Sequence, residues 1–74
     1  MTEYLLHFKV FNQEQEHHVW VSNSYIIEDF MKEIEPLWKI KGYELFGFET
    51  KSFLDQKKSW FDNKIVSGDH IMVI

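Results

Sequence analysis

The chain has 74 residues, of which 45% are hydrophobic and 18% aromatic, and its net charge at pH 7 is −4. This length is too short for two hydrophobic cores, so we expect a single domain over residues 1–74. The content of core-forming side chains excludes a disordered chain, and no run of about 18 apolar residues predicts a membrane helix. Eight basic residues against twelve acidic ones argue against nucleic acid as a partner.

The sequence contains no cysteine, which excludes disulfides, thiol nucleophiles and thiolate metal sites. The first residues lack the basic stretch followed by an apolar run that marks a secretion signal. We therefore expect a cytoplasmic protein that is not inserted into a membrane and is stabilised by its hydrophobic core alone.

Two segments of alternating pattern open the chain. From Tyr4 to Phe11, the even-numbered residues form one apolar face, which predicts a strand. The polar residues 12–16 predict a turn, and in the following segment Val19 and Val21 alternate with polar or aromatic neighbours. Together these segments predict a β-hairpin.

A helix of about 10–12 residues is expected next, with Ser22, Asn23 and Ser24 as candidate N-caps. Apolar residues then recur at spacings of three and four: Ile27, Phe30, Met31 and Ile34. Pro36 cannot donate a helical hydrogen bond and disfavours helical geometry at the residue before it, so the helix is expected to end or kink there. The residues expected to cover the edge of the core after this point are Leu37, Trp38 and Ile40.

Three further strands are predicted in the second half: residues 43–48, a short strand at residues 53–54, and residues 71–74. Because the last of these is entirely apolar, it is expected in the interior of the sheet beside the first strand. This order predicts an α+β fold, a β-grasp roll in which one helix packs across one face of a mixed sheet of four to five strands.

Residues 19–34 resemble the second strand and the start of the helix of ubiquitin without a gap, and the family's core aliphatic positions fall on Val19, Val21, Ile27, Phe30 and Ile34. Residues 59–65, Ser-Trp-Phe-Asp-Asn-Lys-Ile, and residues 68–73, Gly-Asp-His-Ile-Met-Val, are similar to the end of ubiquitin. The resemblance covers nearly the whole chain and implies a ubiquitin-like β-grasp fold. Its motifs are core patterns, so they specify the fold rather than an activity.

Conjugated ubiquitins and related sulfur carriers act through a flexible tail that ends in Gly-Gly. This sequence has Met72, Val73 and Ile74 at that place, so we expect no conjugation. Among relatives without the tail, it looks most similar to the small bacterial ubiquitin-like proteins encoded with type VII secretion systems. This resemblance implies an accessory, protein-binding role in such a system. The alternative is a small β-grasp subunit of a multicomponent enzyme, such as a diiron oxygenase.

The sheet face turned away from the helix is the predicted binding site, because a monomer seldom exposes a contiguous apolar patch. In the ubiquitin family this face is the usual partner surface, and the resemblance places Phe46 and Ile74 at its centre. We define the outer sheet face by these residues: Leu5, His7, Phe11, Trp20, Phe46, Phe48, Met72 and Ile74. Three occupants remain as alternatives: a protein partner, a second copy in a homodimer, or the segment between Phe48 and Trp60 folded back.

We predict no catalytic site, because the sequence has no phosphate-binding glycine loop and no HExxH motif, and so small a domain rarely hosts catalysis. A hairpin register that pairs His7 with His18, and a family register that sets His70 beside His7, would place three imidazoles about 4.8 Å apart. These histidines are candidate zinc or nickel ligands, with Glu16 as a fourth, or a pH-sensitive contact. Ordinary exposed histidines are the simpler alternative, so we expect no metal and no cofactor.

Overall fold

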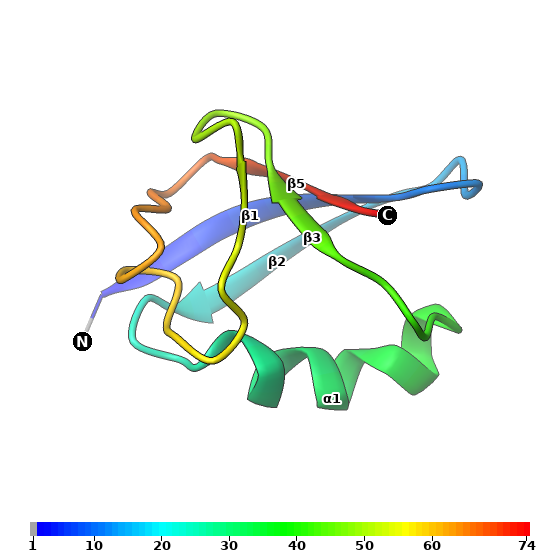
Figure 1. Cartoon of the computed structure of the whole chain (residues 1–74), viewed down its shortest axis with the longest axis horizontal. Helices are drawn as coiled ribbons and strands as arrows, with labels where there is room; N and C mark the ends of the chain where they lie inside the picture. Colours follow the sequence, from blue (N-terminus) through cyan, green and yellow to red (C-terminus); the bar gives the residue numbers. More distant parts are fainter. Residues whose placement is uncertain (1) are drawn as a thin grey trace.

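A computed structural model describes residues 2–74 of the protein. The elements in chain order are β1 (Glu3–Val10), β2 (Glu16–Ser22), α1 (Ile27–Trp38), β3 (Leu45–Gly47), β4 (Ser52–Phe53) and β5 (His70–Val73). The strands form one layer, and α1 lies across one side of it (Figure 1). The predicted α+β roll with one helix on one face of a mixed sheet is therefore confirmed.

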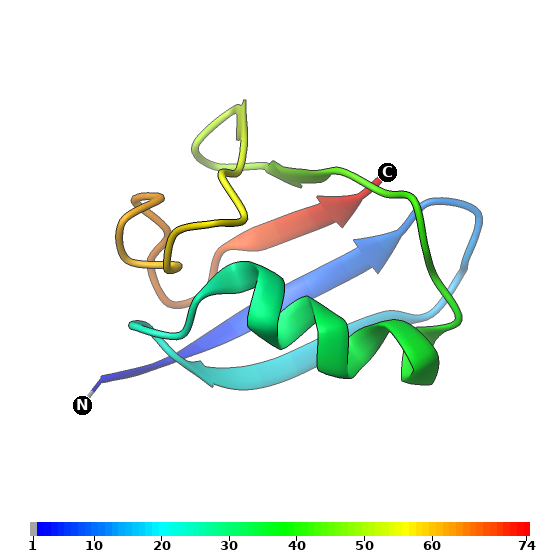
Figure 2. The ribbon, with the colours of Figure 1, turned by 60° about the horizontal axis from the view of Figure 1, so that its bottom comes forward.

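The five strands are ordered β2-β1-β5-β3-β4, with β2 at one edge (Figure 2). β1 pairs antiparallel with β2 and parallel with β5, and β5 also pairs with β3. The last strand is thus interior, as its apolar sequence predicts. In this register His7 lies opposite His18 on one side and His70 on the other, which confirms the expected alignment of the histidines.

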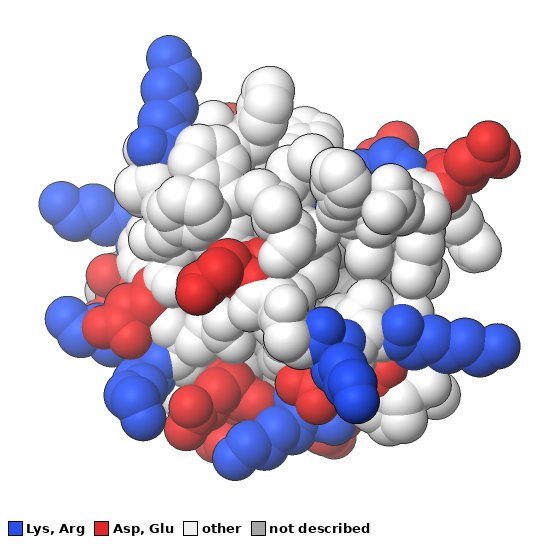
Figure 3. Space-filling model, turned by 45° about the vertical axis from the view of Figure 1, so that its right-hand side comes forward, with Lys and Arg blue, Asp and Glu red and all other residues white. Residues whose placement is uncertain are grey.

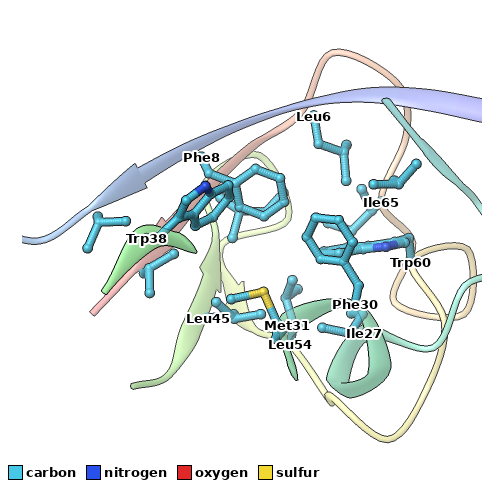
Figure 4. Packing of buried hydrophobic residues seen from close by; sticks show 14 residues of the cluster. Leu6, Phe8, Ile27, Phe30, Met31, Trp38, Leu45, Leu54, Trp60 and Ile65 are labelled. Atoms are coloured by element: carbon cyan, nitrogen blue, oxygen red, sulfur yellow. The ribbon is translucent and has the colours of Figure 1, made fainter. Parts of the chain in front are cut away.

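The core lies between the sheet and α1 and is centred on Phe8, which is fully buried. The Phe8 ring centroid lies 5.2 Å from that of Trp38 and 5.8 Å from those of Phe30 and Trp60 (Figure 4). Edge-to-face and offset aromatic pairs at such distances are worth about 0.5–1.5 kcal/mol beyond the area they bury. Trp60 comes from the long segment between β4 and β5 and is completely buried, so this segment forms part of the core.

The predicted N-cap of the helix is wrong. α1 begins after Ile26, and no side-chain cap is found for it within residues 2–74. Instead, the first backbone N–H groups of the helix, from Ile27 and Glu28, donate to the carbonyls of Lys58 and Gln56 at 3.0 and 2.8 Å. The loop after β4 therefore satisfies two of the free donors of the helix, a role that capping side chains often have.

Of the two outcomes expected at Pro36, an end or a kink of the helix, the end is wrong: α1 continues to Trp38, and its C-cap residue, Lys39, adopts a left-handed conformation with φ 57°. Burial of the Trp38 ring and two contacts from the β1–β2 hairpin hold this last turn. The imidazole of His17 stacks on Trp38 at 4.1 Å, and the Gln13 side chain donates to the Trp38 carbonyl at 3.0 Å. Leu37, expected to cover the core edge, is 73% exposed, whereas Trp38 is buried.

Within the described part of the chain, no helix combines the length and the apolar character that crossing a bilayer requires.

Candidate functional site

The outer sheet face carries a shallow groove of about 380 Å³ where β1 and β5 meet the residues that follow β3. The residues lining it are His7, Lys9, Glu16, Phe48, Glu49, His70, Ile71 and Met72. Three members of the predicted site, His7, Phe48 and Met72, thus come together in one depression. In Figure 3, uncharged side chains cover much of the upper part, on the side of the sheet, whereas charged groups are dense in the lower part, where α1 lies.

The other predicted residues lie around this groove. Phe11 and Ile74 line a separate pocket at the end of the sheet where β1 and β5 finish, and Trp20 borders a pocket between β2 and α1. Among the predicted residues, those with exposed side chains are Phe11, Trp20, Phe48 and Ile74. The half-buried ones are Leu5, His7, Phe46 and Met72.

Phe46 is partly covered by β4. Its ring meets the ring of Phe53 edge-to-face, with centroids 5.2 Å apart, and Phe53 itself is 61% exposed. The chain after β3 therefore does fold back over part of the face, but it leaves Phe48 64% exposed. Phe48 is the large apolar side chain that the groove offers to a ligand, and Phe53 adds an apolar residue that the sequence pattern did not assign to this face.

The three histidines lie side by side on the outer face. The ring centroids of His7 and His18 are 4.7 Å apart, and those of His7 and His70 are 4.9 Å apart. The Nδ1 atoms of His7 and His18 lie 2.5 Å from each other, so one ring donates the proton that the other accepts. No three His, Cys, Asp or Glu side chains within residues 2–74 are arranged to hold a metal ion.

The carboxylate that contacts the histidines is Glu49, and not the expected Glu16. One Glu49 oxygen lies 2.5 Å from His70 Nδ1, and the other accepts the His70 backbone N–H at 2.8 Å. The antiparallel pairing of β3 with β5 brings the residues after β3 beside His70, as the 2.9 Å bond from the Phe48 N–H to the His70 carbonyl illustrates. The sequence pattern does not specify how the chain leaves β3, so it contains no signal from which Glu49 could have been found.

Partial burial on its own would raise the pKa of Glu49, but the hydrogen bonds from the His70 backbone and imidazole outweigh it and hold the pKa below its usual range. A lowered carboxyl pKa stabilises the folded state at every pH above the unfolded pKa, and this contribution is lost as the pH falls through the folded pKa.

We therefore expect Glu49→Gln to destabilise the protein at pH 7 and to have no effect at acidic pH, where both proteins carry a neutral side chain. Because the pair is exposed, the difference should stay below about 1 kcal/mol. Urea unfolding of wild type and variant at both pH values measures it. An equal destabilisation at acidic pH would mean that the carboxylate charge is not the cause.

The Tyr43 hydroxyl donates to a Glu35 carboxylate oxygen at 2.6 Å and joins the start of β3 to α1. Burial, the hydrogen bond to Glu35 and its negative charge raise the pKa of Tyr43 well above the usual range. At neutral pH this side chain is therefore neutral and Glu49 is ionised, which are their ordinary states.

No protein-family model matches this chain, and no curated protein matches it. Among solved structures, the N-terminal ubiquitin-like domain of the 4931431F19Rik protein aligns with a TM-score of 0.77 and 15% identity, over 97% of this chain and 73% of that one. The UBL domain of Plasmodium falciparum Dsk2 aligns with a TM-score of 0.76 and 17% identity, over 99% and 100%. The helix across a mixed five-stranded sheet and these two neighbours together identify the fold of the chain as the ubiquitin-like β-grasp fold.

Proposed function

We propose that this protein is a non-catalytic module that binds another protein through its outer sheet face. The observation that carries the proposal is the exposure of large apolar side chains at and around the groove: Trp20 is 63% exposed, Phe48 64% and Phe53 61%. Burying one such side chain gains about 1.5–3 kcal/mol, and monomeric proteins rarely leave a large contiguous apolar patch in water.

The composition of the groove favours a protein as the ligand. Phe48 and Met72 supply an apolar centre, and Lys9, Glu16 and Glu49 supply charged groups at the rim. An aromatic or apolar centre within a polar rim is the usual anatomy of protein–protein interfaces. One Lys against two Glu does not fit a phosphate backbone, in agreement with the net charge of −4.

Neither Glu49 nor Tyr43 has the pKa shift expected of a catalytic acid or base at neutral pH. Catalytic acids and bases have pKa values displaced toward the working pH. The pKa of Glu49 is lowered and that of Tyr43 is raised, so both pKa values move away from neutral pH. Both groups thus act as hydrogen-bond partners within the fold.

We further propose a bacterial setting: a single cytoplasmic domain that serves as an accessory component of a type VII-like secretion system. The support for this part is the resemblance in length and core pattern to the small ubiquitin-like proteins encoded with such systems. In this setting the partner is a subunit of the secretion machine. We expect the complex to be reversible, because an accessory module must remain soluble when it is not bound.

The test is capture from native cell lysate with wild-type protein and with Phe48→Asp, after circular dichroism has established that both are folded and light scattering that both are soluble. We expect wild type to retain one secretion-machine subunit that the variant does not. Retention of the same partner by both proteins would refute the outer sheet face as the binding surface. Capture of an oxygenase subunit would refute the secretion assignment but leave the binding face in place.

A further inference from the structure

The free edge of β2 is a second surface with unsatisfied bonding groups. β2 is seven residues long, and within residues 2–74 its only neighbour in the sheet is β1. The Asn23 N–H donates to the Thr2 carbonyl at 2.8 Å, and hydrogen bonds of an antiparallel ladder recur at every second residue. His17, Val19 and Val21 therefore bond to β1. The backbone N–H and C=O groups of His18 and Trp20 point away from the sheet, where another strand could pair with them.

This edge lacks the features with which proteins usually protect such strands, which are short length, Lys, Pro or a bulge. β2 contains neither Lys nor Pro, and its register with β1 runs without a bulge from Ser22 to Glu16. The opposite edge of the sheet is different, because β4 has only two residues, Ser52 and Phe53. The long edge of β2 is thus the place where an additional strand would fit.

The residue order of β2 fits a second copy of itself. In an antiparallel pair related by a two-fold axis at Val19, all seven residues of one strand lie opposite the seven of the other. The outward backbone groups of His18 in each copy then face those of Trp20 in the other copy. Glu16, the only residue of β2 that carries a full charge, then lies opposite the uncharged Ser22. The pairing therefore places no like charges opposite each other, and the exposed Trp20 side chain gains a cross-strand neighbour in His18 of the second copy.

From this juxtaposition we propose that two copies of the protein associate through antiparallel pairing of their β2 edges, centred on Val19, to form a continuous ten-stranded sheet. The interface is isologous, as expected for a two-fold dimer. It uses the edge of the sheet and leaves Phe48, Glu49 and Met72 of the groove uncovered, although Glu16, which lines the groove, and Trp20, which belongs to the outer sheet face, both lie in β2.

Because the chain has no cysteine, a single substitution can report the pairing. In a non-hydrogen-bonded antiparallel pair the two Val19 Cα atoms would lie about 4.5 Å apart, within the range of about 4.4–6.8 Å that a disulfide spans. We expect Val19→Cys to form a cross-linked dimer under mild oxidation. Ser52→Cys, at the exposed short edge, is the matched control and should cross-link roughly tenfold more slowly or not at all, because that edge is too short to pair.

A second substitution separates the β2 edge from the outer sheet face. The double variant Val19→Cys, Phe48→Asp should cross-link as fast as Val19→Cys alone. In sedimentation at high concentration, both wild type and the Phe48→Asp variant should be dimers. Loss of the dimer in the Phe48→Asp variant would assign self-association to the outer face and overturn the proposal. A wild type that stays monomeric at millimolar concentration would overturn it as well.

Amide hydrogen exchange on the wild-type protein provides a test that needs no substitution. Protection of the His18 and Trp20 N–H groups should rise with protein concentration, because only the second copy bonds them. The Val19 N–H, which bonds to β1, should be protected at every concentration. Protection of His18 and Trp20 that does not change with concentration would contradict the pairing.

Discussion

Phe8→Ala is expected to remove a large fraction of the free energy of unfolding at 25 °C. The Phe8 ring is completely buried and lies within 5.8 Å of the rings of Phe30, Trp38 and Trp60, so its removal leaves a cavity between the sheet and α1. Such truncations cost about 3–5 kcal/mol. A domain of this length has roughly 4–11 kcal/mol of stability in total. Urea unfolding followed by tryptophan fluorescence measures the loss.

The matched control for this prediction is Phe48→Ala, which removes the same atoms from a side chain that is 64% exposed. It should change the free energy of unfolding by no more than about 0.5 kcal/mol, as surface substitutions usually do. If Phe8→Ala cost as little as Phe48→Ala, the aromatic cluster around Phe8 would not be the centre of the core.

Phe48→Asp is expected to weaken binding of the partner protein by at least roughly 30-fold, since hot-spot residues contribute about 2 kcal/mol or more. The substitution puts a carboxylate beside Glu49 in a groove whose apolar centre would be buried in the complex. Desolvating that charge without a partner group adds to the lost apolar contact. Isothermal titration of the captured partner with wild type and variant gives the ratio of the dissociation constants.

Phe61→Asp is the matched control, because Phe61 is 61% exposed, almost as much as Phe48. It lines two pockets, one just before α1 and one beside the start of β1, that share no residue with the groove. We expect this variant to bind as tightly as wild type. Equal weakening by both substitutions would indicate a general effect of added negative charge, and weakening by Phe61→Asp alone would move the binding surface to that end of the molecule.

The first two strands, β1 and β2, could be predicted from the sequence because each has a two-residue alternation that only one orientation toward the core satisfies. The position of β5 followed from its apolar sequence, since an interior strand has both edges paired. The helix ends could not be predicted in the same way. The cap of α1 consists of backbone carbonyls of Lys58 and Gln56, whose proximity depends on the tertiary fold, and the turn after Pro36 is held by the burial of Trp38.

The site was predictable to the extent that it follows from strand register. Pairing of His7 with His18 needed only the hairpin register, whereas its pairing with His70 was expected from the register of the ubiquitin family. The contact between Glu49 and His70 depends on how the chain leaves β3, and the covering of Phe46 by Phe53 depends on the turn into β4. Alternation within a strand contains no information about such turns, so the sequence pattern alone did not specify these contacts.

The most direct test of the binding face is an NMR titration of isotopically labelled protein with its captured partner. We expect the largest changes in chemical shift at the outward-facing residues around the groove, His7, Phe48 and Met72, and little change along the exposed side of α1. Changes concentrated on α1, with the groove residues unaffected, would contradict the assignment of the outer sheet face as the site of protein binding.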